Sequence, residues 1–549
     1  MATYKTPGVY VEEISTLPPS VAEVSTAVPA FIGCTANGPT PDATGKVAPI
    51  VRRINTLLDY ETLFGEANPS GFTITTGASS SDVGVVTRAT PTYEYLLHYS
   101  LSLYFKNGGG SCYVVSVGNY STAPTKDQFL AGLAALEKED EPTLILLTEA
   151  THLAADDYYT VCQQALAQCK KLGDRFAILD VPAAGVDDFR SKIGANALMY
   201  GAAYHPYIQT TLNYDYLENQ VNIGAASTSW KKAFGANGIL VSYNGADGDA
   251  PKARIVAGAA ADPVTFSITS SKALTISAVA GKTGLTVAAA WATWKADAAN
   301  NALGFDIVKN GDGSAVIDAA SQVALENESA ASTLAAIKSS NTALYNQVKT
   351  ALAQQRVTLP SSPAIAGVYA SVDRDRGVWK APANVSLSAV IGPVTKINHE
   401  DQENLNVDPT AGKSINAIRA FTGKGTLVWG ARTLAGNDNE WRYISVRRLF
   451  NMIEESTQKA TAFAVFEPND ATTWLKVKAM IESYLYGLWQ QGALAGSTPD
   501  DAYFVNVGLG KTMTAQDVLE GRMIVEIGAA AVRPAEFIIL RFTHKLQQA

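Results

Sequence analysis

The sequence predicts an α/β protein of several domains, in which helices cover a mixed or parallel sheet. Three observations support this fold class. Apolar runs of strand length alternate with helical patterns between residues 112 and 181, the composition changes over residues 209–357, and a strand-like segment lies at each chain end. With 549 residues, 47% of them hydrophobic, the chain is long enough to bury several cores.

The first half of the chain carries the β-α-β signal. A helical pattern over residues 91–105 ends in Asn107-Gly108-Gly109-Gly110, where glycine adopts the left-handed turn that closes a helix. Strand-like runs at 112–117, 143–147 and 176–181 then alternate with helical patterns at 129–136 and 156–172. Continuously apolar strands joined by helices are typical of a parallel sheet that is buried on both faces.

Residues 209–357 differ in character from the rest of the chain. Of residues 241–340, 26 are alanine, and two short segments, 264–269 and 274–279, alternate strictly between apolar and polar residues. Such alternation indicates half-buried strands, so we expect an inserted, partly β domain. A helical pattern through Leu334, Leu344 and Leu352 returns the chain to the main body.

The C-terminal part contains the clearest helix of the sequence. Asp470 is placed to cap it, an apolar stripe runs from Trp474 to Trp489, and Gly492 ends it. We expect strands at 463–466, 503–507 and 523–527, and a short helix that begins at Thr514 with Asp517 as its capping partner.

Both chain ends look like strands that lack a partner nearby. Residues 4–14 read as an alternating strand, residues 536–542 are apolar except for Glu536 and Arg541, and prolines at 7, 18, 19 and 534 separate the segments from their neighbours. An unpaired strand exposes backbone hydrogen-bonding groups, so natural proteins either cover such a strand or use it. We therefore expect a projecting arm at each chain end, whose strand is either covered or used in pairing.

Charge and cysteine content exclude several classes of protein. The 43 Lys and Arg residues and 51 Asp and Glu residues give a net charge of -8 without any basic run, so nucleic acid is not an expected partner. No stretch approaches about 18 apolar residues and the N-terminus lacks a signal-peptide pattern, so we expect synthesis in a cytoplasm and no membrane insertion. Cys162 and Cys169, seven apart on a helix, are about 10 Å apart along its axis, too far for a disulfide.

The sequence offers no convincing catalytic, metal or cofactor site. Gly508-Leu509-Gly510-Lys511-Thr512 invites a phosphate-loop interpretation, but Val505 occupies the position of the required first glycine. The five histidines are scattered without metal-binding spacing. Asp373 and Asp375 would share one face of a strand, but the adjacent Arg374 and Arg376 favour ion pairing over acid-base chemistry.

One long segment nevertheless resembles a known family. Residues 366–384, with Asp373-Arg374-Asp375-Arg376-Gly377-Val378-Trp379 at their centre, closely resemble the central motif of contractile tail-sheath proteins. Further similar segments follow in the family's order: Pro7 to Glu13, Tyr104 to Val115, Ile415 to Arg419, Val428 to Leu434, Tyr443 to Leu449, Phe466 to Asn469 and Arg533 to Phe537. The resemblance covers residues 1–208 and 358–545 and leaves the alanine-rich domain unmatched.

The resemblance implies a structural sheath subunit and not an enzyme. Such subunits form a helical sleeve of stacked rings around an inner tube, and the sleeve contracts to drive the tube through a target envelope. Implied partners are further copies of this chain, an inner tube protein, and baseplate and tail-terminator or cap proteins, in a phage tail or injection particle. Other self-assembling shell or adhesin components, and an α/β enzyme, remain alternatives.

The resemblance also implies domains and site residues. We expect an arm at 1–20, an α/β domain at 21–208, the insertion at 209–357 on the outer surface, a tube-facing sheath domain at 358–530 and a second arm at 531–549. The inter-subunit residues would be Val9, Tyr10, Val11, Glu12 and Glu13, and Glu536, Phe537, Ile538, Ile539, Leu540, Arg541 and Phe542. Asp517 and Glu520 would face the tube, and the structural motif residues would be Asp373, Arg374, Asp375, Arg376, Gly377, Trp379, Arg432, Arg447 and Arg448.

Overall fold

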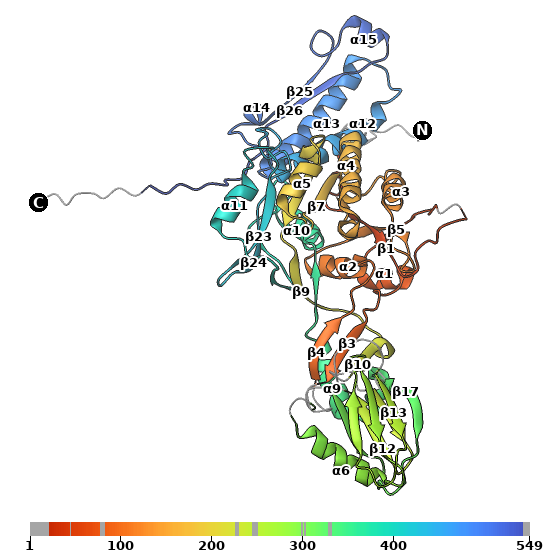
Figure 1. Ribbon diagram of the computed structural model, residues 1–549. Helices are drawn as coiled ribbons and strands as arrows, with labels where there is room; N and C mark the ends of the chain where they lie inside the picture. The colour runs from red at the N-terminus through yellow and green to blue at the C-terminus, as the bar shows by residue number, and fades with distance from the viewer. Residues whose placement is uncertain are drawn as a thin grey trace, which may run out of the picture. The chain divides into compact units, whose positions relative to one another are not determined.

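The computed structural model describes residues 21–43, 46–76, 83–224, 230–243, 251–297, 300, 304–327 and 332–541 (Figure 1). The chain divides into two compact units. Unit 1 comprises Met1–Asn68, Thr92–Leu212 and Arg356–Ala549, and unit 2 comprises Pro69–Pro91 and Asn213–Gln355. Each unit is described below by itself.

A nine-stranded mixed sheet forms the centre of unit 1. Six consecutive strands are parallel, in the order β5 (Cys112–Gly118), β1 (Pro29–Cys34), β6 (Leu144–Leu146), β7 (Phe176–Asp180), β8 (Gly201–His205) and β23 (Ile415–Phe421). Antiparallel strands extend both sides: β2 (Ile50–Ile54) pairs with β5, and β24 (Gly425–Trp429) and β21 (Val385–Ser386) follow β23. The predicted parallel sheet is therefore confirmed.

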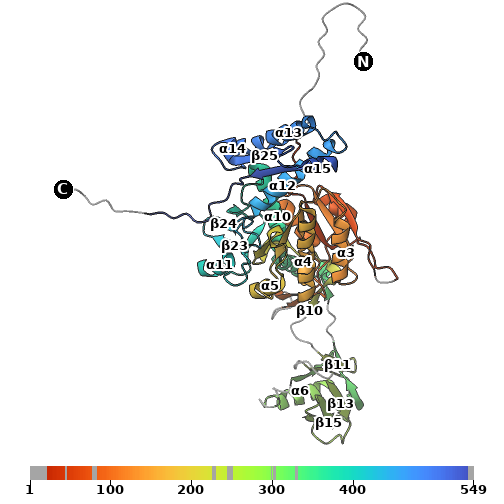
Figure 2. The same cartoon turned by 90° about the horizontal axis from the view of Figure 1, so that it is seen from above.

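Helices bury both faces of this sheet. Ala30 and Ile32 of β1 pack in one core with α3 (Lys126–Leu136) and α4 (Ala155–Leu172), which Figure 2 shows side by side. Phe31 lies on the opposite face, with its ring 5.2 Å from that of Tyr104 in α2 (Leu97–Lys106). Residues 29–34 are buried without exception, as expected for a strand covered on both sides.

The second helix on the α2 face is α10 (Ser362–Arg376), where the predicted strand interpretation of residues 373–379 is wrong. Gly367 allows α10 to approach α2 closely, because a Cβ at that position would lie 2.7 Å from the Tyr104 carbonyl oxygen. Gly377 ends α10 with φ 85°, and a Cβ there would lie 2.4 Å from the ring of Trp379. Glycine is required at both positions.

Further elements of unit 1 connect the sheet to the C-terminal part. They are α1 (Leu57–Phe64), α5 (Val186–Lys192), α11 (His399–Asn406) and a three-stranded sheet of β20 (Arg356–Leu359), β9 (Ile208–Asn213) and β22 (Val390–Pro393). Helix α2 begins at Leu97 and not near residue 91 as predicted.

The C-terminal part of unit 1 has its own core. It contains α12 (Ile444–Thr461), α13 (Ala471–Gln490), α14 (Pro499–Ala502), α15 (Ala515–Leu519) and a hairpin of β25 (Tyr503–Val507) and β26 (Val525–Ala529). Asp470 caps α13 by accepting a hydrogen bond from the Thr473 N–H at 2.9 Å, and Gly492 follows the helix with φ 81°, as predicted. The strand predicted at 463–466 is wrong: a 3-10 turn, Ala462–Ala464, precedes a fully exposed Phe466.

Unit 2 is mainly β. Strands β16 (Phe305–Lys309), β12 (Ile239–Tyr243), β11 (Trp230–Phe234) and β18 (Glu326–Asn327) form one sheet, and β14 (Thr265–Ile268), β15 (Ala273–Ser277), β13 (Lys252–Val256) and β17 (Ala320–Ala324) form another. The two sheets share a core with α6 (Gly284–Lys295). Strands β14 and β15 match the two alternating segments of the sequence.

A second core of unit 2 includes a segment that the sequence assigns elsewhere. Here β3 (Phe72–Thr76), β4 (Val83–Arg88), β10 (Val221–Gly224) and β19 (Ser332–Thr333) form a sheet against α8 (Leu334–Ser340) and α9 (Thr342–Leu352). Because β3 pairs in parallel with β10, residues 69–91 belong to unit 2, although the sequence analysis leaves them in the first α/β domain.

Candidate functional site

The hairpin of β25 and β26 is the least complete sheet of unit 1. The two strands pair only with each other among the described residues, from Tyr503↔Ala529 to Val507↔Val525. Val505 is buried against the C-terminal core, whereas Phe504 on the other face is 49% exposed. Each strand therefore presents one outer edge whose backbone groups are available to another strand.

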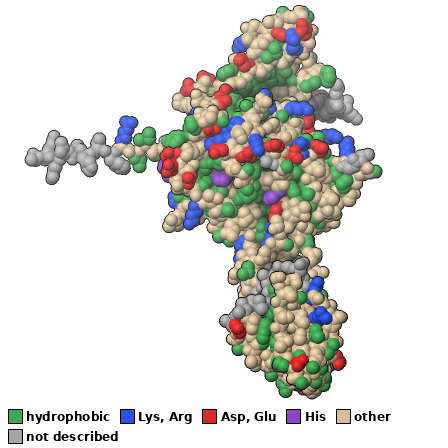
Figure 3. Space-filling model, viewed as in Figure 1, with side chains coloured by type: hydrophobic (Ala, Val, Ile, Leu, Met, Phe, Trp, Pro, Cys, Tyr) green, Lys and Arg blue, Asp and Glu red, His purple; other side chains and the backbone are tan. Residues whose placement is uncertain are grey.

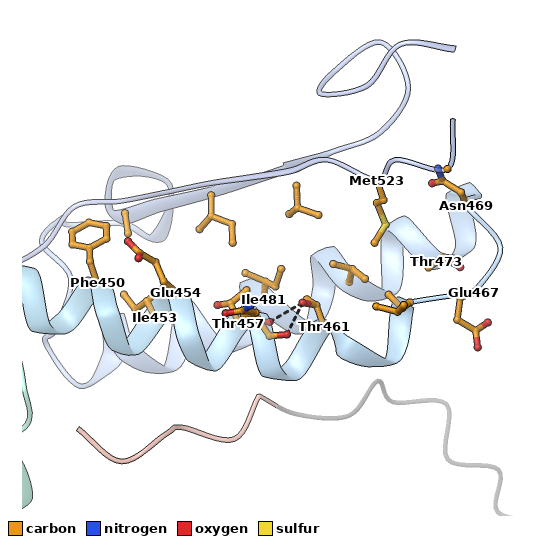
Figure 4. Close-up of a pocket in the computed structure, with 18 of the residues that line it drawn as sticks. Phe450, Ile453, Glu454, Thr457, Thr461, Glu467, Asn469, Thr473, Ile481 and Met523 are labelled. Carbon is orange, nitrogen blue, oxygen red and sulfur yellow. Dashed lines mark hydrogen bonds between the residues drawn. The ribbon is translucent and has the colours of Figure 1, made fainter. Parts of the chain in front are cut away.

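An apolar groove of about 1020 Å³ runs beside this hairpin. Helices α12 and α13 form its floor and β26 one wall, and Figure 4 shows Phe450 and Glu454 pointing from α12 toward the side on which Met523 lies. Apolar side chains come from the helices, from β26 and from the residue two before it, and polar side chains of α12 and α13 also line the groove: Ile453, Val477, Ile481, Met523, Val525, Ile527 and Ala529 are apolar, and Glu454, Thr457, Gln458, Thr461 and Thr473 are polar. A groove of this size and character suits an extended apolar segment.

One of the carboxylates that line the groove, Glu454, is paired with Arg447. The guanidinium of Arg447 lies 4.1 Å from the ring centroid of Trp441 and donates to Glu454 at 2.9 Å and to Asn451 at 2.7 Å. Trp441 in turn contacts Phe450 edge to face, with 5.3 Å between ring centroids. Arg447, predicted from the motif to be structural, therefore orders one wall of the groove.

The C-terminal arm extends away from unit 1 as a free segment (Figures 1 and 2). Phe537, Ile538, Ile539 and Leu540 are each at least 70% exposed, and hydrophobic side chains follow this projecting segment in Figure 3. Residues 536–541 form no strand within this chain, and Phe542 lies outside the described residues. The predicted strand is therefore absent here, because the segment meets no strand edge of its own subunit.

Glu536 differs from the rest of the predicted C-terminal arm. Its carboxylate accepts hydrogen bonds from Arg432, at 2.9 and 2.6 Å, from Asn406 at 2.8 Å and from the Tyr443 hydroxyl at 3.2 Å. Burial alone would raise the pKa of Glu536, but Arg432, Asn406 and Tyr443 outweigh burial and hold the pKa below its usual range. Within this chain Glu536 binds its own subunit, so the free arm begins at Phe537.

The N-terminal arm residues Val9, Tyr10, Val11, Glu12 and Glu13 lie outside the described residues. The first described residues, Val21 and Val24, pack against the C-terminal core. The Val24 N–H donates to the Ser456 hydroxyl at 3.2 Å, and the Thr26 hydroxyl donates to Asp373 at 2.6 Å.

The central motif separates its two carboxylates instead of pairing them. Asp373, on the buried side of α10, accepts from Arg448 at 3.0 Å, and the side chains are 6% and 3% exposed. Asp375, two residues along the helix, is exposed and pairs with Arg374 at 3.1 Å. Arg376 is exposed at the helix end. Ion pairing, as the sequence favours, describes both acids.

Asp517 and Glu520, predicted to face a tube, lie on and directly after α15. Both carboxylates pair with Arg522, at 2.8 and 2.6 Å, and Asp517 also accepts from Thr514 at 2.7 Å. Leu519 between them is 82% exposed. The negative charge of this region is thus partly neutralised by a neighbour that the sequence analysis does not consider.

The described residues offer no metal centre: no group of three or more His, Cys, Asp or Glu side chains could hold an ion. Residues 508–513 form a tight turn, in which the N–H groups of Thr512 and Met513 donate to the Gly508 carbonyl. All four cysteines are buried and free. Within the described ranges, no helix is long and apolar enough to cross a membrane.

Two buried carboxylates escape the sequence analysis. Glu149 accepts from the N–H groups of Cys34, Leu96 and Leu97 at 2.8 to 3.1 Å, and Asp180 accepts from Ser362 at 2.8 Å. Burial raises the pKa of Glu149 and of Asp180 to about 7, although these donors oppose the shift. Glu149 follows strand β6 and binds the start of α2, whereas Asp180 ends strand β7 and binds the start of α10. An acidic residue at the end of a buried parallel strand is the sequence signal that could have identified both.

Comparison with known proteins matches the same region. The model of the phage tail sheath C-terminal domain matches residues 436–545, which contain the groove, the hairpin and the described arm. The tail sheath protein of Vibrio phage KVP40 is 28% identical over 136 residues, covering 25% of this chain and 20% of that protein. The chain thus matches about a fifth of the length of that relative.

Solved structures match over nearly the whole chain. The sheath complex of the extracellular contractile injection system PVC, in its contracted state, is 29% identical with a TM-score of 0.54 and 99% coverage of both chains. The contracted helical sheath of the anti-feeding prophage is 27% identical with a TM-score of 0.56, covering 99% of this chain and 100% of that one.

Fold, groove and comparisons together place this chain among the structural components of contractile tails and tail-like particles. Residues 436–545 match the phage tail sheath C-terminal domain, and over nearly its whole length the chain is similar to chains of the PVC and anti-feeding prophage sheath structures. The similar solved structures are sheath assemblies and baseplate complexes.

Proposed function

We propose that this chain is a sheath subunit that polymerises as a helical sleeve of stacked rings around an inner tube, and that contraction of the sleeve drives the tube through a target cell envelope. One observation carries the proposal: a single chain holds both an exposed apolar arm and an open hairpin with an apolar groove. The PVC and anti-feeding prophage sheaths similar to it are assemblies in the contracted state.

The arms join neighbouring subunits by strand addition. Residues 537–542, and Val9 to Glu13 at the other end, pair with the outer edges of β25 and β26 in other copies. Backbone hydrogen bonds give such a joint its direction, and apolar side chains of the arm fill the groove and give it affinity. Because the joint is made of chain ends, it can act as a hinge while the subunit bodies move as rigid units.

The role is mechanical and not catalytic. A metastable extended lattice needs no hydrolysis, because a gain of a few kcal/mol per subunit, summed over many coupled copies, exceeds the roughly 5.5 kcal/mol that reverses a two-state population. Glu454 at the groove is paired with Arg447, and Glu149 and Asp180 are fully buried, which supports a structural role for these carboxylates.

Partners follow from the same role. Further copies, an inner tube protein, a baseplate and a tail-terminator or cap complete the particle, which is assembled in a bacterial cytoplasm. Asp517 and Glu520 face the tube, and Leu519 between them adds an apolar contact. Arg522 already binds both carboxylates, so a basic tube surface must share or displace it.

Electron microscopy of a truncated chain tests the proposal. Deleting residues 537–549 should abolish striated tubes while circular dichroism and thermal unfolding stay near those of the intact chain. A second variant keeps the length but replaces Phe537, Ile538, Ile539 and Leu540 by serine, and it should also form no tubes. Normal tubes of two lengths from either variant would contradict the proposal.

A further inference from the structure

The C-terminal arm leaves the subunit at a sharply defined point. The Glu536 carboxylate accepts four close hydrogen bonds from Arg432, Asn406 and Tyr443, whereas the next residue, Phe537, is 70% exposed. Arg432 is itself held in place, because its backbone N–H donates to Asn416 at 2.8 Å and its guanidinium donates to the Asn406 carbonyl at 3.1 Å. The side chain of Arg432 is only 5% exposed.

The start of the described chain is fixed in a comparable way. The guanidinium of Arg448 donates to the Thr26 carbonyl at 2.9 Å and to Asp373, and the Thr26 hydroxyl donates to the same carboxylate at 2.6 Å. Thr143 adds a hydrogen bond to the Thr26 carbonyl at 2.9 Å. Arg448 lies 4.6 Å above the ring of Tyr369, and its side chain is 3% exposed.

The two sites share a construction that ordinary core packing does not require. In each, a nearly buried arginine binds a carboxylate and holds a residue at the root of a chain end. Arg432 binds the carboxylate of the root residue Glu536, 104 residues away, and Arg448 binds Asp373 and the carbonyl of Thr26, 422 residues away. Burying a charge is costly unless it is paired and hydrogen bonded, and arginine holds its partner with a rigid fork of donors. Such a contact fixes direction as well as position.

We infer that Arg432 and Arg448 are arm anchors, which hold the roots of the C-terminal and N-terminal arms so that both arms leave the subunit from fixed points. The inference rests on the proposed donation of the arms to neighbouring copies. It assigns these two arginines a positioning role in assembly, beyond the stability of their own subunit.

Anchoring matters because a free chain end loses entropy when it docks. The fixed backbone upstream of Glu536 ends near Val532, whose N–H donates to the Ala493 carbonyl. Without the Arg432 contact, residues 533–536 would move with the arm, and each further residue that is ordered on docking loses conformational entropy. The anchor removes most of that cost before two subunits meet.

Distance measurement between two spin labels tests the C-terminal anchor directly. The four native cysteines are buried, so Glu403→Cys on α11, an exposed position, and Ile538→Cys on the arm can be labelled selectively. Below the concentration for assembly, the labelled subunit should give a narrow distance distribution, and the addition of Glu536→Gln should broaden it severalfold. An equally narrow distribution in the Glu536→Gln variant overturns the inference.

Assembly of unlabelled protein provides the second readout. Glu536→Gln should raise the critical concentration for tube formation at least tenfold. Glu141→Gln, which breaks the exposed Arg53–Glu141 pair, is the matched control and should change neither readout. Thermal unfolding of Glu141→Gln should stay near that of the parent, whereas Glu536→Gln leaves the nearly buried Arg432 without its carboxylate and should unfold at a lower temperature, so both readouts are taken below that transition. If the label distances broaden but the critical concentration stays unchanged, the anchor does not serve assembly, and this result also overturns the inference.

The N-terminal anchor is tested by Thr26→Val, which removes the hydroxyl bonded to Asp373 and keeps the side-chain shape. Spin labels at the exposed positions Glu23 and Glu467 should give a broader distance distribution in this variant. An unchanged distance distribution would refute the inference for Arg448 and leave it for Arg432 alone. The truncation of residues 537–549 separates the two ideas. If that truncated chain builds tubes, the proposed arm donation fails, whereas the anchors stand or fall on the label distances.

Discussion

Strand β6 in the central sheet and strand β25 in the hairpin show two opposite ways of treating a strand edge. Strand β6 pairs in parallel with β1 and β7, and its three residues are completely buried. Strand β25 pairs on one side only, and Phe504 on it is half exposed. In the first region, both edges of the strand pair with strands of the same chain. The second has open edges that the proposed arm donation would fill, so changes there should affect assembly more than folding.

Loss of the N-terminal arm should have the largest effect, because it should abolish assembly while the subunit still folds. Deleting Met1 to Thr16 leaves the contacts of Val24 and Thr26 in place, so circular dichroism and thermal unfolding should be close to those of the intact chain. Electron microscopy should nevertheless show no extended sleeve. If the truncated protein unfolds, the arm belongs to its own core; if it builds normal contractile tubes, the arm is no lattice connector.

A charge inside the groove should come next in effect. Ile527→Glu places a carboxylate on the groove face of β26, where docking of an apolar arm would leave it buried without a partner. We expect tube formation to be lost or to need at least tenfold more protein. Leu475→Glu, at a 68% exposed position of α13, is the matched control and should assemble normally, as sedimentation would show.

Replacing one isoleucine by alanine in each region should lower the free energy of unfolding by different amounts. Ile32→Ala in β1, at a position 1% exposed, should lower the free energy of unfolding by about 2–5 kcal/mol. Ile527→Ala in the open hairpin should cost about 1 kcal/mol or less in the free subunit. Chemical denaturation of unassembled protein measures both, and equal losses would contradict the distinction between the regions.

Stability of the central sheet should fall as the pH rises through neutrality. The folded-state pKa values of Glu149 and Asp180 are raised to about 7, so their contribution is fully present below the unfolded values of 4.5 and 3.8. It is lost as the pH rises through about 7, by roughly 1.4 kcal/mol per pKa unit and carboxylate. Unfolding midpoints should decrease between about pH 4.5 and 7 and then level off, and Glu149→Gln should flatten the decrease. A midpoint that rises over this range would refute the assignment.

Removal of the outer part of unit 2 should have the smallest effect on assembly. Strands β10 and β19 are antiparallel, so Asn-Gly can replace residues 225–331 and close them as a tight turn. This deletion removes the two-sheet core and keeps the sheet that contains β3 and β4. We expect tubes of normal length, and their absence from a folded deletion protein would show that the module takes part in the lattice.

Sequence reasoning succeeded where local patterns determine structure. The continuously apolar runs became β6 and β7, and the capped, striped segment became α13 with its predicted ends. It failed at α10, because alternating Asp and Arg residues suggested a strand, whereas the helix begins at Ser362-Pro363 and is set by close packing of Gly367 against α2. Phe466 is apolar and yet fully exposed, which no periodicity indicates.

Contacts between residues that are distant in sequence explain why the remaining features could not be predicted. Nothing near β3 reveals that it pairs with β10, about 150 residues further along the chain. The arginines of the motif were identified, but their partners Glu536 and Thr26 lie 104 and 422 residues away. Arg522 is close to Asp517 and Glu520 in sequence, but its pairing with both depends on the turn after α15. Such partners can be identified only from the three-dimensional structure.

The presence of arm and groove on different surfaces of one chain gives any array a polarity. A joint in which one copy donates and the next receives is heterologous, so it repeats in one direction and does not close on itself in pairs. A growing column then has two unlike ends, one with empty grooves and one with unused arms. With the proposed arm donation, a protein that binds one end of the column would meet a surface that the other end lacks.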